Sequence, residues 1–98
     1  MTVYAADERT WSAQNVTLPL YRRSRAALGD DPRIDAIVAA LEAAARQRPL
    51  SGIGVPGTAV RILRASRYAD SPPLRLYYCV AGTAVYFLWI EQYDEMEP

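Results

Sequence analysis

The last third of the chain carries the clearest pattern of apolar and polar positions. Apolar and polar residues alternate at the start of 74–80, LRLYYCV, with the two-residue period of a strand that buries one face. The run 84–90, AVYFLWI, is apolar on both faces and rich in aromatic and β-branched residues, which favours a central strand. Gly82 between them can take the positive φ of a hairpin. With the run before them, the pattern predicts three antiparallel strands over 58–67, 74–80 and 83–91.

A helix is predicted from residue 32 to about residue 48. Asp31 can accept a hydrogen bond from a free amide as N-cap, and Pro32 suits the first helical position. Pro49 ends the helix. Apolar residues recur at helical spacing and form one stripe: Ile34, Ile37, Val38, Leu41, Ala44 and Ala45.

The N-terminal part of the chain is less regular. Residues 16–21, VTLPLY, alternate like a strand, and Pro19 places that strand at an edge or a bulge. Residues 22–28 predict a short helical turn closed by Gly29. Residues 1–15 show no clean period, so they either dock on the core or form a loosely ordered arm.

Together these elements predict an α+β fold, with an N-terminal strand and helices packed on a C-terminal three-stranded antiparallel meander. We expect a single domain over 1–98, with an acidic tail at 94–98 and a turn-rich connector at 49–58. Besides the helix stripe, the expected core contains these strand residues: Val60, Ile62, Leu76, Tyr78, Val80, Val85, Phe87, Leu88, Trp89 and Ile90.

The composition excludes several kinds of chemistry. The chain has no histidine and one cysteine, Cys79, so a Ser-His-Asp triad, a histidine metal site and a disulfide framework are all excluded. We expect no metal and no other cofactor. The sequence has no apolar run of about 18 residues and no signal pattern, which predicts a cytoplasmic protein with no membrane contact.

Charge is unevenly distributed, although the net charge is zero. Every basic residue is arginine, and residues 21–67 carry nine arginines against four acids. Residues 68–98 carry one arginine against five acids. Arginine clusters suit phosphate because the guanidinium is a fixed fork of donors. The basic middle is therefore either a surface for phosphate or an acidic partner, or a solvated face.

The strand period assigns the arginines to faces. Arg61 and Arg67 share one face of the strand at 58–67, and Arg64 lies on the other. Tyr77 shares a face with Arg75 on the next strand. If Arg61 or Arg67 faces Arg75 across the two strands, like charges meet and favour an anionic ligand. The alternative is that Asp70, Glu91 or Asp94 already pairs with these arginines.

The element order and one short motif resemble the RelE/ParE superfamily of bacterial toxins. The motif is Arg75-Leu76-Tyr77-Tyr78, followed by the turn at Ala81-Gly82 and the apolar strand from Val85 to Ile90. The resemblance covers about residues 16–93. It implies a toxin of a type II toxin-antitoxin system, which acts on ribosome-bound messenger RNA or on DNA gyrase. It also implies an antitoxin-like protein partner.

Within that resemblance, candidate roles fall to arginines and tyrosines. In a metal-free RNA endonuclease, Arg61, Arg67 and Arg75 would stabilise the charged phosphorane. Tyr78 or Tyr93 would act as general base or as a stacking platform for a base.

Two further residues extend the candidate site, and the function class stays open. Arg64 and Tyr77, with Arg67, are candidates for binding nucleic acid or a partner. The alternative function is a non-catalytic protein-interaction module with the same fold, and a homodimer is also open because the chain is small.

Overall fold

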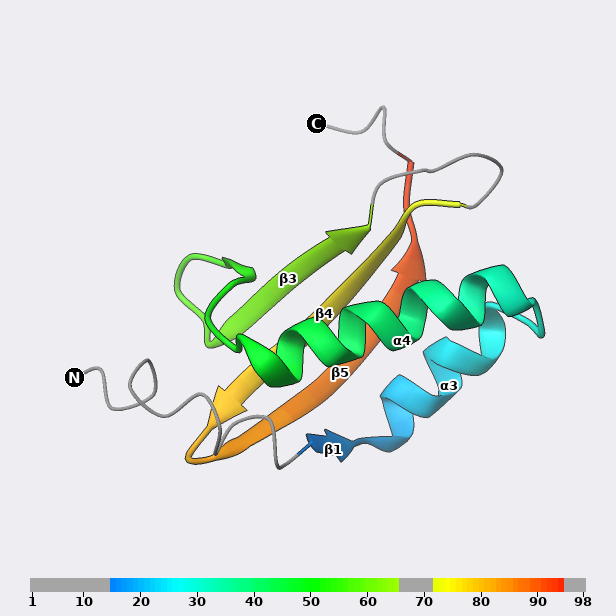
Figure 1. The fold of residues 1–98 in the computed structure, drawn as a ribbon. Coiled ribbons are helices and arrows are strands. Elements are labelled where there is room, and N and C mark those ends of the chain that lie inside the picture. Colours follow the sequence, from blue (N-terminus) through cyan, green and yellow to red (C-terminus); the bar gives the residue numbers. More distant parts are fainter. Residues whose placement is uncertain (1–14, 66–71, 95–98) are drawn as a thin grey trace.

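The strands form one sheet in the order β1-β5-β4-β3-β2 within the residues that this computed structural model describes, 15–65 and 72–94 (Figure 1). The strands are β1 (Asn15–Thr17), β2 (Ile53–Gly54), β3 (Val60–Ala65), β4 (Leu74–Ala81) and β5 (Ala84–Gln92). Neighbours from β2 to β5 pair antiparallel, whereas β1 pairs with β5 in parallel. The predicted α+β fold with a C-terminal meander is therefore confirmed. The acidic tail beyond Asp94 and most of the N-terminal arm lie outside the described residues.

Helix α3 (Pro19–Ala27) replaces half of the strand predicted at 16–21. That prediction is wrong beyond Thr17, because Pro19 begins a helix instead of sitting in an edge strand. The fixed φ of proline and its missing amide suit the first helical position as well as they suit a strand edge. The helix closes as predicted at Gly29, which has a φ of 83°.

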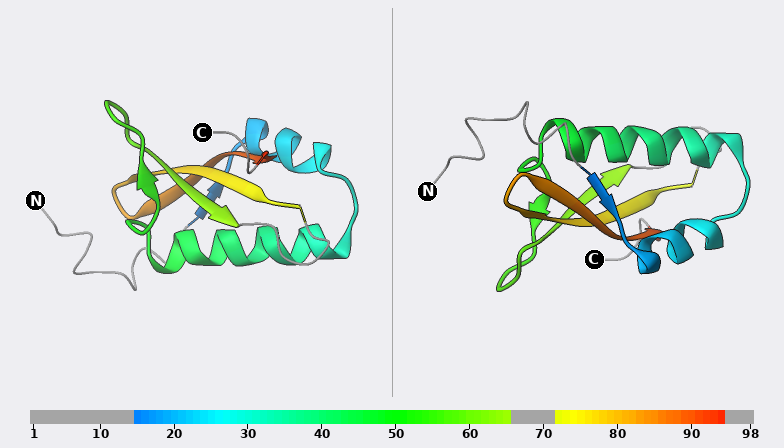
Figure 2. Two further views of the ribbon diagram at one scale, coloured as in Figure 1. Left: turned by 90° about the horizontal axis from the view of Figure 1, so that it is seen from above. Right: turned by 90° about the horizontal axis from the view of Figure 1, so that it is seen from below.

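Helix α4 (Pro32–Gln47) begins where the sequence predicts. The Asp31 side chain accepts a hydrogen bond from the amide of Arg33 at 2.9 Å, and Pro32 takes the first helical position. The buried residues of α4 are Ile34, Val38, Leu41 and Ala45. They cover one face of the sheet over β3 and β4, while α3 lies along the β5 edge (Figure 2).

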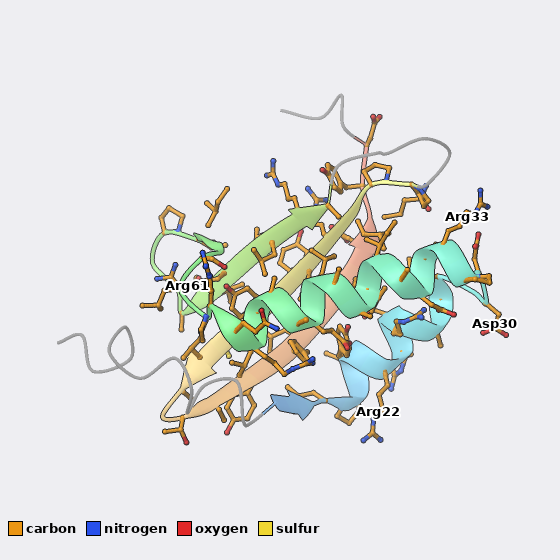
Figure 3. The ribbon with its side chains drawn as sticks, viewed as in Figure 1. Arg22, Asp30, Arg33 and Arg61 are labelled. Atoms are coloured by element: carbon orange, nitrogen blue, oxygen red, sulfur yellow. The ribbon has the colours of Figure 1, made fainter. Side chains whose placement is uncertain are left out.

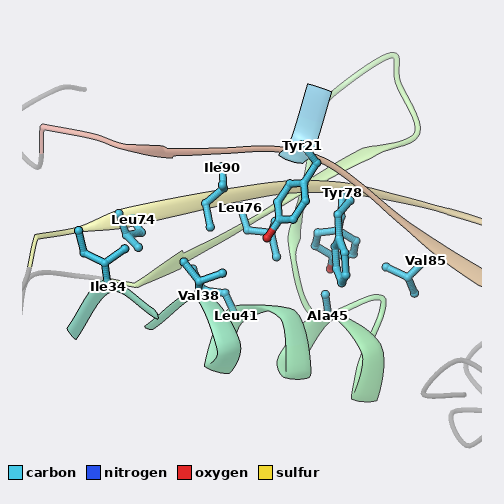
Figure 4. Close-up of a cluster of buried hydrophobic side chains, with 11 residues drawn as sticks. Tyr21, Ile34, Val38, Leu41, Ala45, Leu74, Leu76, Tyr78, Val85 and Ile90 are labelled. Carbon is cyan, nitrogen blue, oxygen red and sulfur yellow. The ribbon is translucent and has the colours of Figure 1, made fainter. Parts of the chain in front are cut away.

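The core lies between α4 and the sheet (Figure 4). Its largest buried strand side chains are Leu74, Leu76, Tyr78, Val85, Phe87 and Ile90. The prediction of Val60 and Ile62 as core residues is wrong. Leu63 pairs with Leu76 and packs against the core, so its neighbours in β3 point to the other face. Each face of β3 carries two apolar residues and one arginine, so alternation alone does not reveal which face meets the helix.

A β-bulge in β5 sets which apolar side chains are buried. Tyr78 pairs with Phe87, but Tyr77 pairs with Trp89, so Leu88 is an extra residue in β5. The bulge returns Ile90 to the helix-covered face, which also holds Phe87. It turns Trp89 to the opposite face, where 39% of its surface is exposed, so the prediction of Trp89 as a core residue is wrong.

Polar contacts tie α3 to its neighbours. The hydroxyl of the buried Tyr21 donates to Glu42 Oε2 at 2.5 Å, and burial together with that bond raises the pKa of Tyr21. Ser24 Oγ accepts from the amide of Ile90 at 3.0 Å, beyond the point where β1 stops pairing with β5. Ser24 therefore provides the acceptor for the Ile90 amide, at a part of the β5 edge where no described strand pairs with it. No helix in the described residues is long and apolar enough to cross a membrane.

Candidate functional site

The sheet face opposite α4 carries a cluster of charged and aromatic side chains. Its members come from β3, β4, β5 and the residue just after β5: Arg64, Arg75, Tyr77, Trp89, Glu91 and Tyr93. We name these six residues the open-face cluster. No described helix covers this face, since α4 lies on the other one and α3 runs along the β5 edge (Figure 2).

The strand register places two arginines opposite each other. Arg64 of β3 pairs with Arg75 of β4, and Arg75 pairs with Glu91 of β5. One of the two registers considered, with Arg61 opposite Arg75, does not form, because Arg61 pairs with Tyr78 on the helix-covered face. Arg67, the other residue of that prediction, lies outside the described residues. The open face does bring like charges together, but through Arg64.

Glu91 is the hydrogen-bond acceptor at the centre of the cluster. Its Oε2 accepts from Arg75 Nε at 2.9 Å, Arg75 Nη2 at 2.6 Å and the Tyr77 hydroxyl at 2.9 Å. Its Oε1 accepts from Trp89 Nε1 at 3.1 Å. Burial acts to raise the pKa of Glu91, but these donors outweigh it and hold the pKa below its usual value. Glu91 is therefore ionised at neutral pH, and the alternative in which it pairs with an arginine is confirmed for Arg75.

Tyr93 lies against both arginines. Its ring centroid is 4.9 Å from Arg75 Cζ and 5.8 Å from Arg64 Cζ. These are cation–π distances, so the ring offsets part of the repulsion between the two guanidinium groups. Arg64 is exposed and has no ion-pair partner within 15–65 and 72–94. One guanidinium of the pair is therefore open to an anion.

Trp89 borders a groove between α3 and β5. The groove has a volume of about 350 Å³ and is lined by Arg23, Ser24, Ala27, Leu28, Trp89, Ile90, Glu91 and Gln92. Its wall is almost entirely apolar. The groove and the open-face cluster share Trp89 and Glu91, so an apolar site adjoins a charged one.

Arg61 and Tyr78 lie away from this face and anchor the connector that leads from α4 to β2. The buried Tyr78 hydroxyl donates to the carbonyl of Pro49 at 2.7 Å and accepts from the amide of Gly52 at 3.0 Å. Burial raises the pKa of Tyr78 and outweighs the opposing effect of the hydrogen bond from Gly52. Arg61 Nη1 donates to the carbonyls of Leu50 and Gly52 at 3.2 and 2.8 Å. Figure 3 shows Arg61 near the start of β3.

The structure therefore divides the predicted site residues between two places. Arg64, Arg75, Tyr77 and Tyr93 come together on the open face, whereas Arg61 and Tyr78 pair with each other on the helix side. Two features of the open face were not predicted from the sequence: Trp89 lies at the surface, and Glu91 lies at the centre of the cluster. Their spacing of two residues indicates that they share a face. The bulge that turns both residues outward has no recognisable pattern in the sequence.

Comparisons with known proteins give no relative: no family model, no curated protein and no solved structure matches this chain. Within the described residues, no group of three or more acidic, cysteine or histidine side chains is arranged to hold a metal ion. A function for this protein is therefore inferred from the geometry of the open face.

Proposed function

We propose that this protein is a RelE/ParE-like toxin whose open-face cluster binds single-stranded RNA, with ribosome-bound messenger RNA as the target. The observation that carries the proposal is the cross-strand pair of Arg64 and Arg75 around the ring of Tyr93. Like charges opposite one another on a sheet are unfavourable, and Glu91 neutralises Arg75 but not Arg64, so Arg64 is the guanidinium of the pair that favours a further anion. A sugar–phosphate backbone supplies anions at regular spacing.

The aromatic members of the cluster support RNA over other polyanions. Trp89 is 39% exposed, and Tyr93 is partly exposed beside Arg64. Bases of single-stranded RNA are free to stack on such rings, and each stacked base contributes roughly 1–3 kcal/mol. The proposed division of work is that Arg64 binds phosphate while Trp89 and Tyr93 hold bases.

Cleavage of the bound RNA would use the same residues. The 2′-oxygen would attack phosphorus, and the bond from phosphorus to the 5′-oxygen would break. A general base of the protein would take the proton of the 2′-hydroxyl. The departing 5′-oxygen would take a proton from a general acid or from water. Arg64 and Arg75 would stabilise the phosphorane, and Tyr93 would act as the general base instead of stacking on a nucleobase. Tyr78 would take no part, because its buried hydroxyl already binds Pro49 and Gly52.

A cell-free bacterial translation assay tests the proposed target. We expect the purified protein to inhibit translation, Arg64→Gln to relieve the inhibition, and DNA supercoiling by gyrase to be unaffected. Arg22→Gln is the matched control, because Arg22 is an exposed arginine of α3 outside the open-face cluster (Figure 3). Normal translation with inhibited supercoiling would favour the gyrase-binding branch of the same superfamily.

A second candidate is a non-catalytic protein-interaction module. The apolar groove of about 350 Å³ beside Trp89 favours it, because such grooves accept apolar side chains of a partner. A module of this kind would leave both translation and supercoiling unchanged. Trp89→Ala would then remove partner binding, whereas Arg64→Gln would leave it intact.

A further inference from the structure

The two arginines of the open-face pair differ in what they bind. Arg64 is exposed and makes no ion pair within 15–65 and 72–94. Arg75 is paired with Glu91, and only 18% of the Arg75 side chain is exposed. Both Nε and Nη2 of Arg75 donate to the same oxygen, Glu91 Oε2. A ligand phosphate that approaches Arg75 therefore meets a carboxylate already in place.

The position of Glu91 Oε2 is the one that a phosphate oxygen would take. An anionic oxygen with two guanidinium donors and the hydroxyl of Tyr77 has the donor set of a bound phosphate. Glu91 is not locked there by burial, because 32% of its side chain is exposed. A rotation of the carboxylate toward solvent would expose to another anion the donors that now bind Glu91 Oε2, which are Arg75 Nε, Arg75 Nη2 and the Tyr77 hydroxyl.

We propose that Glu91 is an internal competitor for the phosphate position at Arg75 and so determines how tightly the open face binds its RNA. This inference rests on the proposed function. In the free protein Glu91 holds Arg75, and Arg64 makes the first phosphate contact. A second phosphate contact forms only when RNA displaces the Glu91 carboxylate, and that displacement lowers the net affinity.

Glu91→Gln separates charge from shape. The variant keeps the size of the side chain and one oxygen acceptor, but it removes the negative charge that competes with phosphate. We expect labelled single-stranded RNA to bind roughly fivefold more tightly at low salt, because a charge-assisted contact is gained without displacing another. The log–log salt slope should steepen by about 0.7, the contribution of one additional phosphate contact in a single strand.

Asp30→Asn is the matched control for net charge. Asp30 is exposed at the connection between α3 and α4, away from the open face (Figure 3), and its substitution also removes one negative charge. We expect no change of slope in this variant. An equal gain in affinity in Asp30→Asn and Glu91→Gln would overturn the inference, because net charge alone would then account for it.

Tyr77→Phe provides a second, independent variant. It removes one donor to Glu91 Oε2 while keeping the ring and all charges. The same hydroxyl would donate to a phosphate in that position, so RNA affinity should change less in Tyr77→Phe than in Glu91→Gln. Unchanged or weaker RNA binding in Glu91→Gln, with thermal unfolding like that of wild type, would contradict the competitor role. If wild type itself binds no RNA at low salt, the proposed function fails before this inference is reached.

Discussion

Arg64 and Arg75 face one another across β3 and β4, on the side of the sheet that α4 leaves uncovered. Tyr93 approaches both guanidinium groups, and Glu91 pairs with Arg75 but not with Arg64. The repulsion between the two arginines is thus only partly offset within the described residues. This imbalance is the physical basis for expecting an anionic ligand on this face.

Ser24→Ala should destabilise the protein by about 1–3 kcal/mol, the usual effect of leaving a buried amide without an acceptor. The variant removes the oxygen that accepts from the amide of Ile90. Ser51→Ala is the control, because Ser51 is exposed and its hydroxyl donates to the carbonyl of Arg48. Urea unfolding measures both, and the control should change the free energy of unfolding by less than about 0.5 kcal/mol. Equal effects of the two substitutions would argue against the α3–β5 contact.

Gly52→Ala should also be destabilising, by about 1–3 kcal/mol, as expected for overpacking of a filled site. A Cβ at position 52 would lie 2.5 Å from the hydroxyl oxygen of Tyr78 and 3.1 Å from Cβ of Arg61. Tyr78 is fully buried and hydrogen-bonded, so it has little room to move.

Gly54→Ala is the matched control for that substitution. It lies two residues further on, and a Cβ there would meet no atom within 4 Å. Thermal unfolding of both variants separates local crowding from the general effect of replacing a glycine. A melting temperature of Gly52→Ala equal to that of Gly54→Ala would contradict the anchoring of the connector by Tyr78.

The stability of the fold should depend on pH through Glu91. Its pKa in the folded state lies below the usual glutamate value of 4.5, so the folded state holds the proton less tightly than the unfolded state. The stabilising contribution is therefore present above that value and is lost as the pH falls through the lower folded pKa. Asp31, whose pKa is lowered by its hydrogen bonds from Arg33, contributes a similar background to every variant.

Unfolding of wild type and Glu91→Gln in urea, from about pH 7 down to about pH 3, isolates this contribution. We expect the difference in free energy of unfolding to be largest at neutral pH and to shrink in acid. A difference that stays constant over the whole range would mean that the Glu91 carboxylate is not stabilised by its donors in the folded protein.

Local signals account for the parts of the fold that the sequence predicts correctly. Asp31 and Pro32 mark the start of α4 by their own chemistry, and the stripe from Ile34 to Ala45 follows from helical spacing. Pro19 shows the limit of such signals. Its ring suits both a strand edge and a first helical turn, and the choice depends on Tyr21 and Ser24, whose partners are far away in the chain.

The candidate site depends on two features that one strand at a time does not reveal. The first is the register of β3 and β4, which decides that Arg64 and not Arg61 lies opposite Arg75. The second is the bulge at Leu88, which turns Trp89 and Glu91 onto the open face. Alternation predicts which residues of a strand share a face, but pairing between strands decides which faces meet.

RNA binding as a function of salt tests the central claim most directly. We would titrate a labelled single-stranded RNA with wild type, Arg64→Gln and the control Arg22→Gln at several salt concentrations. Because Arg64 makes the first phosphate contact, we expect the log–log slope of Arg64→Gln to be less steep than that of wild type by about 0.7. Arg22→Gln should match wild type. No binding at low salt, or the same slope and affinity in all three proteins, would contradict an RNA-binding role for the open-face cluster.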